Sequence, residues 1–118
     1  MPELVPAPTR IPVPGGKVID EYVGRASTGT DQLSVAHMVA PGGWTEPAQT
    51  PAFDEVTVVL RGEVLVEHDR GVLRVAAGQA VLTRAGERVR YSTAEGVEAE
   101  YVAVCLPAFG PELAHRDD

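Results

Sequence analysis

Hydrophobic and polar positions alternate over short runs along most of this chain, and turn residues separate the runs. Eight runs are expected to be strands, at residues 18–23, 32–40, 53–61, 63–68, 72–75, 80–83, 88–92 and 97–106. They are rich in valine, and no window holds apolar residues at helical spacing for three turns. Short, regularly spaced strands of this kind predict an all-β sandwich or barrel.

The two ends of the chain depart from this alternation. Residues 1–16 hold five of the ten prolines, which disfavour both a central strand and a helix start. We expect an extended arm there, lying over the barrel or over a partner subunit. Residues 17–110 are expected to form one barrel domain. Residues 111–118 are expected to make one short turn at most and to end in a solvated charged tail.

Alternation within a strand also predicts where side chains point. On the run 53–61, Glu55 and Thr57 share one face and are expected to point inward. Tyr91 and Tyr101 have the inward parity of their own strands. His37 shares parity with Leu33, Val35 and Val39, so it is expected on the apolar side of its strand.

Composition and charge narrow the class of protein. A chain of 118 residues with 44% hydrophobic and 23% charged residues suits one soluble domain. A net charge of −7 disfavours nucleic acid and anionic membranes as partners. The chain shows neither a long apolar run nor a secretory signal pattern, so a cytoplasmic location is expected. The one cysteine, Cys105, is interpreted as a small buried hydrophobe, with a reactive thiol as the alternative.

Two spaced motifs carry a resemblance to a known family. Gly43, Glu55 and Gly62 match G-x5-H-x-H-x3-E-x6-G, the first motif of the cupins. Gly78 and Gly86 match the glycines of the second cupin motif, G-x5-P-x-G-x2-H-x3-N. Within the cupins, residues 53–63 and 100–108 resemble the cupin domain of the ethanolamine-utilisation protein EutQ. The resemblance implies a double-stranded β-helix (jelly roll) with a ligand pocket in its mouth.

The family's metal ligands are largely missing from these motifs. Many cupins bind a divalent metal through three histidines and a glutamate, and the corresponding positions here are Gln49, Pro51, Val89 and Glu55. Proline and valine cannot ligate, and an amide oxygen is a weak ligand for transition metals. We therefore expect neither a metal nor another cofactor, although an unorthodox site using Glu46, Gln49, Glu55 and His37 stays open.

Without a metal, an inward Glu55 has a desolvation problem. Either its pKa is raised, which makes it a usable general acid or base, or it is held by Arg90, Tyr91 or a buried water as a structural relic. Tyr91 and His37 are the other candidate catalytic residues, and a His37–Glu55 pair would suit proton transfer.

The candidate substrate-binding residues are Gln49, Trp44, Glu46, Thr57 and Tyr101. Gln49 would orient a polar group, and the tyrosines would offer hydroxyls to a ligand. Trp44 and Glu46 precede Gln49 at the expected barrel mouth, where Trp44 would form an apolar lid or pack against a second subunit. Plain packing is the alternative role for the aromatic residues and for His37.

Three functions follow from these residues. The first is a metal-independent enzyme that acts by proton transfer on a small polar metabolite, as an isomerase, lyase or cyclase. The second is a noncatalytic cupin that binds a small molecule, and the third is a metal enzyme with atypical ligands. The acetate kinase activity attributed to EutQ proteins is not expected, because no phosphate-cradling loop is present. A homodimer is expected, since the arm and exposed strand edges offer an interface.

Overall fold

A computed structural model describes residues 1–117 and places nine strands and one short helix in them. The elements are β1 (Thr9–Ile11), β2 (Val18–Val23), β3 (Ser34–Ala40), β4 (Asp54–Arg61), β5 (Glu63–His68), β6 (Gly71–Ala76), β7 (Ala80–Thr83), β8 (Arg90–Ser92), β9 (Ala99–Leu106) and α1 (Pro111–Ala114). The eight expected strands are all present, most within two residues of the expected bounds. The all-β prediction is confirmed.

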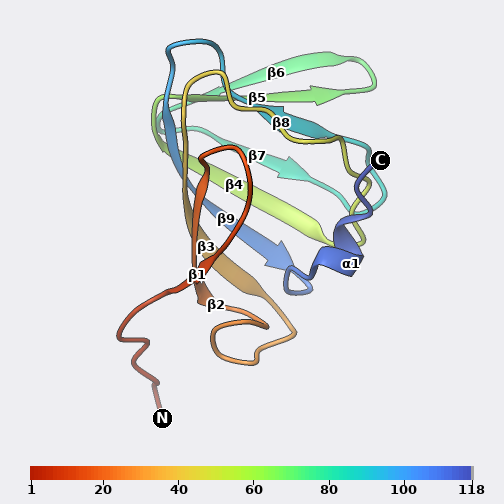
Figure 1. Ribbon diagram of the computed structural model, residues 1–118. Helices are drawn as coiled ribbons and strands as arrows, with labels where there is room; N and C mark the ends of the chain where they lie inside the picture. Colours follow the sequence, from red (N-terminus) through yellow and green to blue (C-terminus); the bar gives the residue numbers. More distant parts are fainter. Residues whose placement is uncertain (118) are drawn as a thin grey trace.

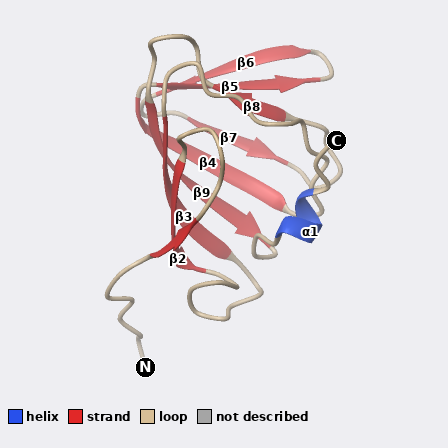
Figure 2. Ribbon diagram, in the orientation of Figure 1, coloured by secondary structure: helices blue, strands red, loops and turns tan. Residues whose placement is uncertain are grey.

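The strands form two sheets that face each other (Figures 1 and 2). The larger sheet has the order β1-β2-β3-β9-β4-β7, and the smaller has the order β6-β5-β8. The pairs between strands are antiparallel throughout. Helix α1 lies at the ends of β4 and β9, where Ala114 packs against Phe53 and Cys105. The result is a jelly-roll barrel with one end partly closed by the C-terminal segment.

The space between the sheets is filled by inward-facing side chains. Val59 of β4 and Val64 and Val66 of β5 are almost fully buried, and Tyr91 and Tyr101 join the same cluster. Burying a valine-sized side chain stabilises the fold by about 1.5–3 kcal/mol. The inward parity predicted for β4, β8 and β9 is therefore confirmed.

Two motif glycines have a backbone reason to be glycine. Gly62 has φ +78°, and a Cβ there would lie 1.9 Å from the carbonyl oxygen of Glu98. Gly43 has φ +74°, and a Cβ there would crowd the carboxylate of Glu95. Such backbone conformations strongly disfavour other residues. These two motif positions are therefore glycine because tight turns of the barrel require it.

The proline-rich arm differs from the expectation in one respect. Residues 9–11 form β1, which pairs with β2 at the edge of the larger sheet. An edge position suits this segment because prolines flank the strand and an edge strand needs only one partner. The first eight residues extend away from the barrel (Figure 1). The homodimer stays a prediction.

The expectation for His37 is wrong. Ser34, Ala36 and Met38 face the interior, whereas His37 lies on the outer face of β3 and contacts Glu100 at 2.7 Å. The interior face of β3 carries small or flexible side chains, and Tyr101 of the neighbouring strand β9 lies directly beside Met38 and fills the barrel there. The outer face also carries apolar residues, so the alternation pointed the wrong way.

No helix in the described part of the chain is long and apolar enough to cross a membrane.

Candidate active site

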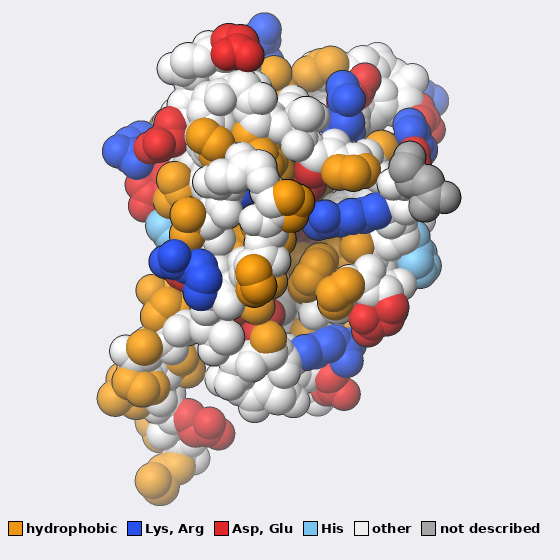
Figure 3. Space-filling model, in the orientation of Figure 1, with side chains coloured by type: hydrophobic (Ala, Val, Ile, Leu, Met, Phe, Trp, Pro, Cys, Tyr) orange, Lys and Arg blue, Asp and Glu red, His pale blue; other side chains and the backbone are white. Residues whose placement is uncertain are grey.

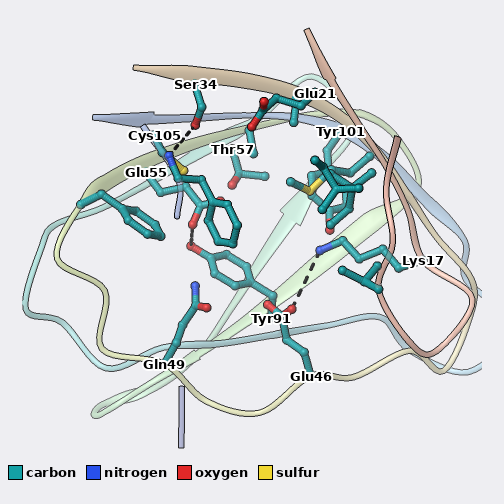
Figure 4. A pocket seen from close by; sticks show the side chains of 18 of the residues that line it. Lys17, Glu21, Ser34, Glu46, Gln49, Glu55, Thr57, Tyr91, Tyr101 and Cys105 are labelled. Carbon is teal, nitrogen blue, oxygen red and sulfur yellow. Dashed lines mark hydrogen bonds and ion pairs between the residues drawn. The ribbon is translucent and has the colours of Figure 1, made fainter. Parts of the chain in front are cut away.

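A pocket opens between the larger sheet and the loops at the barrel mouth (Figure 4). About 70 Å³ of it is open to water-sized molecules, and most of its lining is apolar. On the face shown in Figure 3, hydrophobic side chains gather around a hollow near the centre, with basic side chains beside it. Polar side chains from eight segments converge in this apolar setting, which is typical of small-molecule sites. They are Lys17, Glu21, Ser34, Glu46, Gln49, Glu55, Thr57, Tyr91, Tyr101 and Arg116.

Glu55 is the central ionisable group of the pocket. It lies on β4 with its side chain inward and is 9% exposed. Burial raises its pKa to about 7, although the positive charge of Lys17 opposes the shift. A carboxyl group with this pKa exists in both protonation states near neutral pH, and so it can act as a general acid or base.

Tyr91 fixes the orientation of this carboxyl group. Its hydroxyl donates a hydrogen bond to Glu55 Oε1 at 3.3 Å and lies 3.2 Å from Thr83 Oγ1. Burial and the neighbouring carboxylate raise the pKa of Tyr91 well above its usual value, so the phenol stays protonated. Of the partners expected for Glu55, the structure shows Tyr91. Arg90 instead points outward and pairs with Glu67 at 2.7 Å.

Two polar atoms in the pocket have no partner. Gln49 Oε1 and Thr57 Oγ1 are buried, and neither has a hydrogen bond within residues 1–117. The backbone of Gln49 is held on both sides by Val89, with hydrogen bonds of 2.9 Å, so its amide group is presented to the cavity. A buried polar atom without a partner costs about 1–3 kcal/mol. A ligand that hydrogen-bonds to these atoms would recover that free energy.

Lys17 is a further polar group of the pocket, and the sequence interpretation missed it. It follows Gly15 and Gly16 and enters the barrel mouth just before β2, with its side chain 8% exposed. Its Nζ lies 4.3 Å from the ring centre of Trp44 and 5.5 Å from that of Tyr101. Burial lowers the pKa of Lys17, although the carboxylates of Glu46 and Glu55 oppose the shift.

Glu46 lies between two cations at the mouth. Its Oε2 is 4.0 Å from Lys17 Nζ and 3.6 Å from a guanidinium nitrogen of Arg116. Arg116 therefore lines the pocket, which corrects the interpretation of the C-terminal tail as solvated and without a role. Hydrogen bonds hold this tail in place, including those from Thr50 N to the carbonyl of His115 and from Asp117 N to that of Ala48.

The remaining candidates separate into two groups. Gln49, Glu46, Thr57 and Tyr101 line the pocket with Glu55 and Tyr91, as expected. Trp44 lines an adjoining hollow instead. It is 5% exposed and packs in the core of its own chain beneath Lys17, so it is not an exposed lid. His37 lies on the opposite side of the sheet and cannot form a pair with Glu55.

The pocket residues do not fit a transition metal at the position that cupins use. Pro51 and Val89 offer no ligand atom, and Gln49 offers only an amide oxygen, so Glu55 is the one strong ligand. The outward position of His37 also removes the only imidazole considered for an unorthodox site. Among residues 1–117, no three His, Cys, Asp or Glu side chains cluster closely enough to hold a metal ion.

A signal for Lys17 was present in the sequence. The chain has nine arginines and this one lysine, which follows a Gly-Gly turn before a strand. Arg116 gave no comparable signal, because its position depends on how the tail folds back against the loop that contains Gln49.

The sequence comparisons identify one curated relative and no family. No family profile matches the chain. The endoribonuclease YbeY of Myxococcus xanthus (strain DK1622) is 49% identical over 107 residues, which is 91% of this chain. The chain spans about a third, 36%, of the length of that protein. The match therefore relates this chain to a part of a larger protein.

The structural comparisons define the class of fold. A Tyr-to-Phe variant of Streptomyces PAC13 with uridine superposes with a TM-score of 0.77 at 13% identity, over 99% of this chain and 89% of that one. PAC13 is described as a nucleoside dehydratase. The ethanolamine-utilisation protein EutQ of Salmonella typhimurium superposes with a TM-score of 0.62 at 21% identity, over 79% of this chain and 71% of that one. The chain has a cupin-type β-barrel fold.

Proposed function

We propose that this chain is a metal-independent acid–base enzyme, of the isomerase, lyase or cyclase type, that acts on a small polar metabolite. One observation carries the proposal. The carboxyl group of Glu55, with a pKa of about 7, lies in an apolar pocket beside two buried polar atoms that lack partners, Gln49 Oε1 and Thr57 Oγ1. A group that can donate or accept a proton, Glu55, thus lies in the same pocket as two polar atoms that could hydrogen-bond to a substrate.

The roles follow from the positions of the side chains. Glu55 transfers the proton, and Tyr91 holds the carboxyl group by the hydrogen bond to Oε1. Gln49 accepts a hydrogen bond from the substrate, and Thr57 either donates or accepts one. The free volume of about 70 Å³ favours a substrate of few heavy atoms, unless the loops at the mouth move apart.

The two named relatives point to different activities. A dehydration is an acid–base reaction, so the description of PAC13 as a nucleoside dehydratase supports acid–base chemistry in a barrel of this fold. The name of the Myxococcus relative points to RNA cleavage, but it belongs to a protein of which this chain matches 36%. The net charge of −7 opposes the binding of a polyanion, and the pocket is too small for a nucleic acid strand.

A noncatalytic binding protein is the second candidate function, because the unpaired Gln49 and Thr57 atoms predict a ligand whether or not it reacts. The experiment that separates the two begins with a thermal-shift screen against small carboxylates, amines, sugars and nucleosides. Each ligand that raises the melting temperature is then incubated with the protein, and its conversion is followed by NMR.

Glu55→Gln is the decisive variant in that experiment. An enzyme loses conversion in this variant and largely keeps binding, whereas Glu67→Gln on the exterior changes neither. If Glu55→Gln converts the ligand at the wild-type rate, the proposed role of Glu55 is wrong. If ligands bind and none is converted by the wild-type protein, the chain is a binding protein.

A further inference from the structure

The only lysine of the chain lies inside the pocket, and its amine has only a long contact with a carboxylate. The nine other basic side chains, apart from histidine, are arginines, and six of them form ion pairs with carboxylates. Lys17 Nζ makes no hydrogen bond within residues 1–117, and its nearest carboxylate oxygen is 4.0 Å away, on Glu46. Figure 4 shows this amine directed into the same cavity as Glu55.

The surroundings of Lys17 suit a reactive amine better than a structural cation. An arginine at this position would offer a guanidinium group suited to a two-pronged contact with a carboxylate, such as the contact that Arg10 makes with Asp20. The apolar walls instead favour the neutral amine, and burial lowers the pKa of Lys17 accordingly. A desolvated lysine in an apolar pocket is a nucleophile toward carbonyl carbons.

We propose that Lys17 forms an imine with the carbonyl group of a small aldehyde or ketone in this pocket. This inference rests on the proposed function and names its substrate class, a small carbonyl compound. The Nζ lone pair forms the C–N bond, and the π electrons of the carbonyl group move to its oxygen. Proton transfer from nitrogen to that oxygen gives a carbinolamine.

The carbinolamine then loses its hydroxyl group as water. The proton needed for this step comes from the carboxyl group of Glu55, which leaves a protonated imine and a Glu55 carboxylate. The positive charge of the imine lies where the ammonium charge lay, so Trp44, Tyr101 and Glu46 stabilise it. The protonated imine acidifies the neighbouring carbon, and the Glu55 carboxylate is the base available to remove its proton.

The presence of one lysine makes the test direct. The wild-type protein is incubated at pH 7 with acetaldehyde or pyruvate and sodium cyanoborohydride, and labelled peptides are quantified by mass spectrometry. Lys17 is the only lysine among the 118 residues, and the α-amine of Met1 serves as an internal reference. An ordinary lysine is labelled far more slowly than an α-amine at this pH, because less of it is neutral.

We expect Lys17 in the folded protein to be labelled at least as fast as Met1. Unfolding the protein in urea should slow the labelling of Lys17 relative to Met1, by about tenfold for each unit by which the fold lowers its pKa. Labelling of Met1 alone, or labelling of Lys17 that speeds up on unfolding, overturns the proposal. Lys17→Arg, which keeps the charge, should lose the pocket label and keep the Met1 label.

The labelling result can be told apart from the outcome for the proposed function. Conversion that depends on Glu55, without labelling of Lys17, leaves the acid–base enzyme standing and refutes the imine. Fast labelling of Lys17, without any conversion that depends on Glu55, supports the amine and refutes the enzyme as proposed.

Discussion

The hydroxyl group of Tyr91 lies 3.3 Å from Glu55 Oε1 and donates a hydrogen bond to this buried carboxyl group in the wall of the pocket. Burial raises the pKa of Glu55, and the hydrogen bond from Tyr91 opposes part of that rise. The phenol itself stays protonated, so it donates to Glu55 in both protonation states of the carboxyl group. Near neutral pH, therefore, Glu55 changes charge while Tyr91 stays neutral.

Replacement of Tyr91 should shift this titration upward. Tyr91→Phe removes the hydrogen bond that lowers the pKa of Glu55, so the pKa should rise above about 7. The variant should lose about 1 kcal/mol of stability at pH 5, where Glu55 is neutral, and more at pH 8, where the lost hydrogen bond was to a charge. Urea unfolding at the two pH values measures this difference. Equal losses at both would show that the hydrogen bond does not stabilise the carboxylate.

Glu55 should make the stability of the protein depend on pH. A carboxyl group whose pKa is raised on folding binds more protons in the folded state, so it stabilises the fold at low pH. That stability is lost as the pH rises from about 4.5 to about 7. The loss is on the order of 3 kcal/mol, because each pKa unit corresponds to about 1.4 kcal/mol.

Glu55→Gln should remove this dependence. The variant should match the wild type near pH 4.5 and exceed it at pH 8 by roughly 3 kcal/mol, since it no longer buries a charge. Denaturant unfolding across this range gives the comparison, and Glu67→Gln is the exterior control. A variant that is less stable than the wild type at pH 8 would mean that the Glu55 carboxylate stabilises the fold.

Thr57 and Thr83 offer a matched pair of buried threonines. Thr57 Oγ1 has no partner among the described residues, whereas Thr83 Oγ1 contacts Tyr91 and the carbonyl of Glu55. Thr57→Val should therefore stabilise the ligand-free protein by about 1 kcal/mol, and Thr83→Val should destabilise it by about the same amount. Urea unfolding measures both changes.

The pair also tests ligand binding. Thr57→Val should weaken a ligand found by thermal shift, because the hydroxyl group that it removes faces the pocket. If Thr57→Val destabilises the free protein as Thr83→Val does, the hydroxyl of Thr57 has a partner and is not reserved for a ligand.

Divalent metals should leave the pocket unaffected. Of the four positions used by metal-binding cupins, only Glu55 carries a strong ligand, so nickel, zinc or manganese should not raise the melting temperature relative to a chelator control. A metal-dependent increase in the wild type that disappears in Glu55→Gln would show that the pocket holds a metal after all.

Most of the fold was predictable because it depends on local alternation and on turns. The motif glycines report backbone conformations, as the 1.9 Å approach at Gly62 shows, so their spacing identifies the barrel even without the histidines. Strand β1 was missed because it is only three residues long and the prolines on either side of it, Pro8 and Pro12, hide any alternation. His37 was misplaced because β3 carries apolar residues on both faces, and the alternation cannot then say which face is inside.

The site was predictable only where it lies on the strands. Glu55, Thr57, Tyr91 and Tyr101 follow from strand parity, and all four line the pocket. Lys17 and Arg116 reach the same pocket from the β1–β2 turn and from the C-terminal tail. Their positions depend on how these segments fold over the barrel mouth. The single lysine after a Gly-Gly turn is a hint for Lys17, whereas no local pattern marks Arg116.

The titration midpoint of the Glu55 carboxyl group is the measurement that tests the proposed mechanism most directly. The side-chain carboxyl carbon of Glu55 can be followed by NMR in protein labelled with ¹³C on glutamate, with Glu55→Gln to assign its signal. We predict a titration midpoint near pH 7. A midpoint near the ordinary glutamate value of about 4.3 would contradict the account, because the carboxylate would then be charged and stabilised throughout the neutral range.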